Sequence, residues 1–222
     1  MFVSSPGPGS EPEHWSRPFT ATMAAMATAA GATVLWLEPA RAATAAADVP
    51  PGVAHRRVPF AEGGAVHRVA AGNRHLAVEL ELTRELRARP TAVVVHVGVG
   101  ARGSPNVGWL AERLGSRSFA VARGAEVVCH RGDLRFRDGT SCAVVDDAAR
   151  CRRCCAAGLF RRPHADDFRN RGDLLVASLQ AAAAVFVPER GDADRLRAFG
   201  LNGVVFVEAG DPAAIVARLG QG

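Results

Sequence analysis

The chain has 222 residues, of which 48% are hydrophobic, so it is long enough to bury a full core, and we expect one domain. Its formal charge of +5 comes from arginine alone, because all 27 basic residues are Arg and none is Lys. The absence of lysine excludes a Schiff base with pyridoxal phosphate and a phosphate-binding loop that ends in Gly-Lys-Ser/Thr.

The first part of the chain alternates between apolar runs and helical patterns. Gly31 ends one helical pattern and Pro90 ends another. In chain order we predict a strand at 2–5, a helix over 18–30, a buried strand at 32–37, an irregular stretch over 41–64 with at most a short strand at 53–58, an amphipathic helix over 66–89 and a strand buried on both faces at 92–97. The pattern that predicts the amphipathic helix is Leu76, Leu80, Thr83 and Leu86.

The second part begins with a helix-start signal, Ser104-Pro105-Asn106, and ends with another, Asp211-Pro212. In chain order we predict a helix over 107–114, a strand at 119–122, an insertion without regular periodicity over 124–165, a helix over 166–182, a strand at 183–187, a helix over 192–199, a strand at 204–207 and a helix over 211–219. Strands that alternate with helices at this spacing predict an α/β fold with a doubly wound, Rossmann-like parallel sheet.

His96 lies at the end of the apolar strand 92–97, where open parallel sheets place groups that bind ligands. Gly98, Gly100 and Gly103 follow, and their backbone amides are candidates to receive an anion before the helix that starts at Pro105. A histidine at a strand end also serves as a structural core residue, and both interpretations stay open.

Four cysteines have the spacing of a metal site, with twelve, eight and two residues between successive members: Cys129, Cys142, Cys151 and Cys154. Zinc prefers a tetrahedron of such donors. An insertion without its own apolar core needs another source of stability, which a bound metal ion can supply. We therefore predict a structural zinc ion with no open coordination position. Cys155 and His130 are spare donors beside the cluster. Free thiols, or disulfides in an exported chain, are the alternatives.

The clustered cysteines suit a reducing compartment, so we expect a cytoplasmic protein. The apolar run at 19–37, followed by Ala40-Arg41-Ala42, resembles a signal peptide. It starts late, behind Glu11 and Glu13, and no stretch is apolar enough to predict a membrane span.

Ten arginines stand against six aspartates between residues 131 and 171, which permits an anionic partner. Tyrosine is absent and few phenylalanines lie nearby, so base stacking has little to use, and an ordinary basic surface is the preferred interpretation over a zinc-dependent nucleic-acid site. The acidic doublets Asp146-Asp147 and Asp166-Asp167 are expected to solvate loops or cap helices rather than to catalyse.

Three segments carry a family resemblance: Cys129-His130-Arg131-Gly132-Asp133-Leu134, Asp138-Gly139-Thr140-Ser141-Cys142 and Cys151-Arg152-Arg153-Cys154. In this order and spacing they resemble the N-terminal, acceptor-side domain of family 4 glycosyltransferases of the two-domain GT-B fold, in the subgroup with a cysteine-rich insertion. The resemblance implies a cleft lined by His96, Arg123 and the loop from Gly98 to Gly103. It also implies an acceptor that is a small molecule or a glycan.

The chain departs from that family where activity would reside. Arg123-Gly124 occupies the position of the family's His-Asp pair, and Glu189 follows Pro188 where the family has Ser. The sequence also matches only one of the two GT-B domains, without the domain that binds the nucleotide sugar. We therefore predict an acceptor-side domain that is active only when a donor-binding partner chain completes it. The alternative is a non-catalytic, zinc-stapled binding or scaffold protein.

Overall fold

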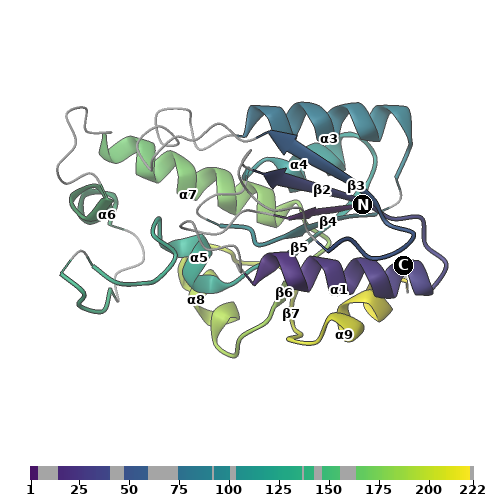
Figure 1. Cartoon of the computed structure of the whole chain (residues 1–222). Helices are drawn as coiled ribbons and strands as arrows, with labels where there is room; N and C mark the ends of the chain where they lie inside the picture. Colours follow the sequence, from purple (N-terminus) through teal and green to yellow (C-terminus); the bar gives the residue numbers. More distant parts are fainter. Residues whose placement is uncertain are drawn as a thin grey trace.

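Seven parallel strands form one sheet in the order β3-β2-β1-β4-β5-β6-β7, with helices on both faces (Figure 1). The computed structural model describes residues 1–4, 15–40, 48–59, 75–91, 93–100, 104–136, 138–142, 147–155 and 164–220. The strands are β1 (Phe2–Ser4), β2 (Leu35–Ala40), β3 (Ala54–Pro59), β4 (Val93–Val97), β5 (Arg117–Val121), β6 (Ala184–Val187) and β7 (Phe206–Glu208). The predicted α/β class with a doubly wound parallel sheet is confirmed.

Helices connect the strands and shield the sheet from water. They are α1 (Ser16–Ala29), α3 (Leu76–Ala88), α4 (Val107–Arg113), α5 (Gly124–Val128), α6 (Ala148–Cys155), α7 (Ala165–Gln180), α8 (Asp192–Ala198) and α9 (Pro212–Leu219). Helices α1 and α9 pack on one face, where Met23 and Ile215 lie over Trp36. Helices α3, α4 and α7 cover the other face (Figure 1).

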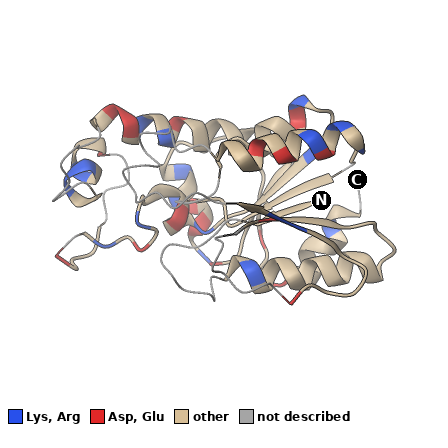
Figure 2. Ribbon diagram, turned by 45° about the horizontal axis from the view of Figure 1, so that its top comes forward, with Lys and Arg blue, Asp and Glu red and all other residues tan. Residues whose placement is uncertain are grey.

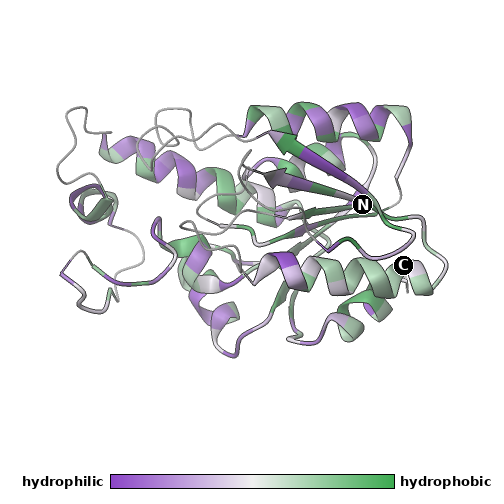
Figure 3. Cartoon of the chain, viewed as in Figure 1, coloured by the Kyte–Doolittle hydropathy of each residue, from purple (hydrophilic) through white to green (hydrophobic). Residues whose placement is uncertain are grey.

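The central strands are apolar on both faces because both faces are covered. Val94 and Val95, neighbours in β4, belong to the cores on opposite sides of the sheet, and each is at most 1% exposed. Figure 3 shows green and pale colouring along α1 and α9, whereas the outer strands of the sheet carry purple residues and α7 shows both colours. Within the described residues, no helix is both long and apolar enough to cross a membrane.

The sequence-based prediction for the apolar side of α3 was right for Leu86 and wrong for Leu76 and Leu80. Leu76 and Leu80 are each 61% exposed, whereas Val78, Leu82 and Leu86 are buried. The buried side also holds Glu79 and Glu85, whose carboxylates are partnered by hydrogen bonds or ion pairs. Leu76 and Leu80 form an exposed apolar stripe beside the buried one, so the periodicity of apolar residues did not by itself identify the buried side. Residues 60–74, the beginning of the longer predicted helix, lie outside the described stretches.

Two helices lie where the sequence predicted no regular structure. Helix α5 has only five residues, and its Val127 and Val128 are buried in the core beneath α7 and α8. Helix α6 has eight residues, none of them buried, and packs against α7. Neither helix is long enough to display a helical period in the sequence.

His96 belongs to the protein core. It pairs in register with Val3 of β1 and Ala120 of β5, so its side chain lies on the face covered by α3, α4 and α7. Only 3% of the residue is exposed. Burial lowers the pKa of His96 to about 3, because removing the imidazolium from water disfavours its charged form.

We expect Gly108→Ala to lower the free energy of unfolding by about 1–3 kcal/mol, the usual cost of overpacking. A Cβ on Gly108 in α4 would lie 2.8 Å from the backbone oxygen of Ser178 in α7. Gly220→Ala is the matched control, because its Cβ would meet nothing closer than 3.7 Å. Urea denaturation followed by circular dichroism measures both, and a Gly108→Ala variant as stable as the parent would contradict the close approach of α4 and α7.

The buried His96 predicts a specific loss of stability in acid. Its pKa is about 3 in the folded chain and about 6.5 in an unfolded one, so the unfolded state binds more protons between these values. Stability should therefore fall as the pH drops through this window, by about 2 kcal/mol from pH 7.5 to pH 5 for this group. Denaturation at both pH values should show a smaller loss in His96→Leu than in the parent. Equal losses would show that His96 is not buried in its neutral form.

Candidate functional site

The strand order reverses between β1 and β4. From β1 the chain proceeds to β2 and β3 on one side, and from β4 it proceeds through β5 and β6 to β7 on the other. Ser4 pairs with Val97 at this point, so β1 and β4 end at the same edge of the sheet. Open α/β sheets bind ligands in the crevice beyond the carboxyl ends of such strands. This edge is therefore the expected location of a ligand-binding site.

Buried carboxylates lie along the carboxyl edge, and each has a partner. They are Glu38 in β2, Glu79 in α3, Glu126 in α5 and Asp192 in α8. Glu38 lies 2.6 Å from Arg17 Nε and 3.1 Å from His55 Nε2. Glu79 Oε1 accepts a hydrogen bond from Asn106 Nδ2 at 3.0 Å. Since a buried charge is costly unless it is paired, these contacts fix the elements that meet at the edge.

Beyond β5 and β6, five residues form what we call the edge cluster: Trp15, Arg123, Glu126, Glu189 and Asp192. The Trp15 indole donates a hydrogen bond to Glu126 Oε1 at 2.5 Å. The Arg123 guanidinium lies over the Trp15 ring, 4.6 Å from its centroid, and Arg123 Nε is 3.2 Å from Glu189 Oε1. The side chains of Arg123 and Glu189 are 35% and 53% exposed, so solvent reaches this ion pair, and Trp15 is partly exposed beside it. Figure 2 shows acidic and basic residues gathered around α5 and α8.

Asp192 is the buried end of the cluster. Its side chain is 1% exposed, Oδ1 accepts a hydrogen bond from Arg195 at 3.0 Å, and no described residue donates to Oδ2. Burial raises the pKa of Asp192, while hydrogen bonds from Arg195 and the backbone of Gly124 oppose that rise. A Cβ on Gly124 would lie 2.7 Å from Asp192 Oδ1, so only glycine permits this approach.

Helix α5 is held at both ends. Asp192 contacts its first residue, Gly124, and the buried Arg171 of α7 binds its last turn. The Arg171 guanidinium donates to the backbone oxygen of Val127 at 3.0 Å and to that of Glu126 at 3.1 Å. The edge cluster therefore rests on a short helix that α7 and α8 fix in place.

The predicted glycine loop has another role at the positions that the structure describes. The Gly98 amide donates to the Val121 oxygen at 2.9 Å, so it is not available to an anion. Gly100 is buried, and a Cβ there would lie 2.7 Å from Glu126 Cβ. Both glycines allow the chain after β4 to pass close to β5 and α5. Gly103 lies outside the described residues.

The two cleft candidates from the sequence are thus separated. Arg123 lies at the carboxyl edge with a partly exposed guanidinium, whereas His96 is buried beneath α3, α4 and α7. Sequence reasoning did not select Trp15, Glu126 or Asp192 as site residues. Asp192 shortly follows an apolar strand, and that placement at a strand end was the signal available for it.

A hairpin and a helix bring the cysteines together. The Cys142 amide donates to the Leu134 oxygen at 2.7 Å, and Arg135 pairs with Ser141 in an antiparallel bridge. Gly139 has a φ of 87°, which suits the turn between these strands. Cys154 of α6 donates through its Sγ to the Arg135 oxygen at 3.8 Å. The hairpin thus brings Cys142 and Cys154 to the same side of the insertion.

The same four cysteines influence one another electrostatically. Burial first, and then the neighbouring thiols of Cys129, Cys142 and Cys154, raise the pKa of Cys151 to about 11. All five cysteines of the chain are free thiols. Across the described stretches, no three His, Cys, Asp or Glu side chains are arranged to hold a metal ion. The zinc ion stays a prediction. The expected capping role of the acidic doublets is confirmed at Asp147 and Asp167.

No protein-family model matches the chain, and no curated protein matches it. Among solved structures, it is similar to UGT73P12 of Glycyrrhiza uralensis complexed with glycyrrhetinic acid 3-O-monoglucuronide, at 12% identity and a TM-score of 0.49, over 98% of this chain and 50% of that one. It is also similar to Os79 of O. sativa in complex with UDP, at 15% identity and a TM-score of 0.47, over 96% of this chain and 52% of that one. The chain therefore spans about half the length of these proteins. Likeness at this level supports no statement about activity, and membership of glycosyltransferase family 4 stays a prediction.

Proposed function

We propose that the chain is the acceptor-side domain of a GT-B sugar transferase, related to family 4 and completed by a donor-binding domain or partner chain. The observation that carries the proposal is the edge cluster, which lies at the carboxyl edge of a parallel sheet and presents a partly exposed Arg123–Glu189 pair. The three sequence segments that resemble the cysteine-rich subgroup support the same function. The ligand-binding edge of one domain would form one wall of a cleft between two.

In this proposal the exposed pair recognises hydroxyl groups of the acceptor. A guanidinium offers several donors and a carboxylate offers two acceptor oxygens, which together match the donors and acceptors of a sugar or polyol. Trp15 and Glu126 hold Arg123 in place from below, through the ring contact and the indole hydrogen bond. His96 acts from the core by packing and does not touch the acceptor.

The four cysteines would hold a structural zinc ion in the insertion. Thiolates are the ligands that closed zinc sites prefer, and four of them leave no position for a substrate. Helix α6 buries none of its residues, so it has little apolar contact to keep it folded by itself. A metal bound by Cys151 and Cys154 of this helix and by Cys129 and Cys142 of the preceding segment would supply that stability.

One observation favours the alternative, a non-catalytic binding or scaffold protein that kept the fold and the zinc staple. Arg123 stands at the position of the family's His-Asp pair, and an arginine stays protonated at any physiological pH. It cannot accept a proton from an acceptor hydroxyl. The alternative keeps acceptor binding at the edge cluster and removes transfer, so a completed enzyme with no transferase activity would favour it.

Ligand binding to the chain alone tests whether the acceptor and the sugar donor bind to different domains. Mono- and disaccharides should shift the NMR signals of the Trp15 indole and the Arg123 Nε–H, and Arg123→Ala should weaken that binding at least about tenfold, the loss of roughly one charged hydrogen bond. Arg113→Ala is the matched control, because Arg113 also lies over a tryptophan, 5.4 Å from the Trp109 ring centroid, but away from the cluster.

Two results would contradict the proposal. One is saccharide binding that perturbs Trp109 and Arg113 as strongly as Trp15 and Arg123. The other comes from calorimetric titration with UDP-glucose and GDP-mannose, for which we expect dissociation constants no tighter than about millimolar for a single wall of the cleft. Micromolar affinity for either nucleotide sugar would place donor binding on this chain.

The metal proposal is tested by elemental analysis of protein purified under reducing conditions. We expect one zinc ion per chain and a loss of that zinc in Cys151→Ser, because three thiolates bind zinc more weakly than four. Cys155→Ser is the control and should keep the metal. Chelation should lower the thermal midpoint of the parent. An absence of stoichiometric zinc would refute the structural zinc ion. Loss of zinc in Cys155→Ser would refute this choice of ligands.

A further inference from the structure

The turn between α8 and β7 contains the chain's only Asn-Gly pair, Asn202-Gly203. Both residues are exposed to solvent. Asparagine is among the chemically labile side chains, and a glycine that follows it has no Cβ to shield its backbone nitrogen. The pair lies apart from both the edge cluster and the cysteine-rich insertion, so any chemistry there is independent of those two sites.

Nothing that the structure describes holds the two groups that would have to react. The Asn202 side chain makes no hydrogen bond to a described residue, and neither does the Gly203 N–H. The Asn202 N–H donates to the Gly200 oxygen at 2.9 Å, which closes the turn. Gly203 has a φ of 78°, and no atom lies within 4 Å of the place that its Cβ would take. The Gly203 nitrogen is therefore open to the side-chain carbonyl carbon of Asn202.

The other asparagines that the structure describes lie in more protective surroundings. The Asn106 side chain donates to Glu79 Oε1 at 3.0 Å, and the next residue, Val107, is buried. Asn170 lies within α7, where helical hydrogen bonding engages the backbone amide of the residue that follows it, Arg171. The structure thus separates Asn202 from these two residues by surroundings as well as by sequence.

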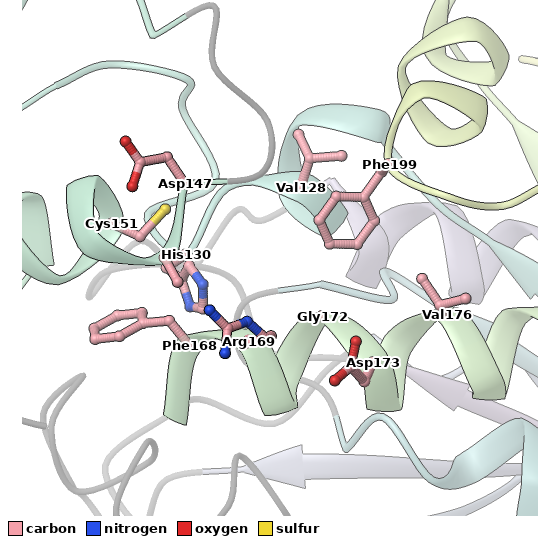
Figure 4. Close-up of a pocket in the computed structure, with 11 residues that line it drawn as sticks. Val128, His130, Asp147, Cys151, Phe168, Arg169, Gly172, Asp173, Val176 and Phe199 are labelled. Carbon is pink, nitrogen blue, oxygen red and sulfur yellow. The ribbon is translucent and has the colours of Figure 1, made fainter. Parts of the chain in front are cut away.

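The segments on both sides of the turn are anchored. Leu201 is fully buried, and Figure 4 shows Phe199 beside Val128, where both residues line a pocket. After the turn, the Val205 oxygen accepts a hydrogen bond from the Val185 amide at 2.9 Å, where the pairing of β6 with β7 begins. The backbone of the turn therefore spans a fixed gap between two anchors.

We propose that Asn202 is a site of spontaneous deamidation in the folded protein. The Gly203 nitrogen loses its proton to hydroxide and bonds to Cγ of Asn202, the bond from Cγ to the side-chain nitrogen breaks, and that nitrogen leaves as ammonia. Water then opens the resulting succinimide at one of its two carbonyl carbons. Opening at one carbon gives aspartate, and opening at the other gives isoaspartate. Water and hydroxide are the only co-reactants.

The two products differ in their effect on the fold. Both add a negative charge at an exposed position. Isoaspartate also places the Cβ of residue 202 in the backbone, which lengthens the turn by one atom between its anchors. We expect this extra atom to displace Val204 and to loosen β7 from β6. The proposal depends neither on the acceptor site nor on the zinc ion.

The test is incubation of the folded, full-length chain in mildly alkaline buffer, followed by peptide mapping with mass spectrometry. We expect the mass gain of an amide-to-acid conversion at Asn202, with isoaspartate among the products, and no gain at Asn106 or Asn170. The conversion should speed up as the pH rises, because hydroxide removes the Gly203 proton. Asn202→Gln should stay unmodified, because its longer side chain would have to form a larger ring. Asn170→Gln is the matched control and should leave the conversion at Asn202 unchanged.

Hydrogen exchange and the thermal midpoint report the structural consequence. Aged protein should exchange the amides of 204–208 faster and melt at a lower temperature than fresh protein. Asn202→Asp carries the charge without the extra backbone atom and should behave like fresh protein. Retention of the Asn202 amide in the folded chain, under conditions in which the urea-unfolded chain converts, would overturn the proposal. Equal conversion at Asn106, Asn170 and Asn202 would also overturn it, because the folded turn would then have no special reactivity.

Discussion

The parallel pairing of β1 with β4 is the constraint on which the rest of this structure depends. All seven strands run in the same direction, so every strand ends at one edge of the sheet, and every connection that follows a strand starts there. Arg123 after β5, Glu189 after β6 and Trp15 before α1 come from distant parts of the sequence. They meet because the strands that precede them end at the same edge of the sheet. The strand order also reverses at the centre of this edge, and open α/β sheets bind ligands at such points.

Paired buried charges fix the positions of the elements that meet at that edge. Glu126 and Asp192 are taken out of water, and each is compensated by a neighbour: Trp15 for Glu126, and Arg195 of the same helix for Asp192. Arg171 does the same for the last turn of α5. Removing one partner would leave an uncompensated polar group, which is far more costly than removing both. The short α5 therefore keeps its position although five residues cannot form a stable helix in isolation.

The insertion differs from the sheet in what stabilises it. Helix α6 buries no residue, while α7, against which it packs, is anchored by Phe168, Leu175 and Leu179. The stability of α6 must come from contacts other than an apolar core, and two candidates lie close together: the hairpin that returns Cys142 to Leu134 and the neighbouring thiols.

The sequence alone determined the strands and their parallel arrangement, because runs such as Val93–Val97 are apolar at every position except His96 and only a sheet covered on both faces accepts them. It also located Arg123 and the cysteine cluster. It could not place His96 in the core, the buried side of α3 on Val78 and Leu82, or α5 and α6 within the insertion. Those outcomes depend on partners that are distant in sequence, such as Trp15 for Glu126 and Gly124 for Asp192. The periodicity of apolar residues indicates which side of a segment faces water and which side faces the protein. The partner of a buried charge, in contrast, is decided only when the chain has folded.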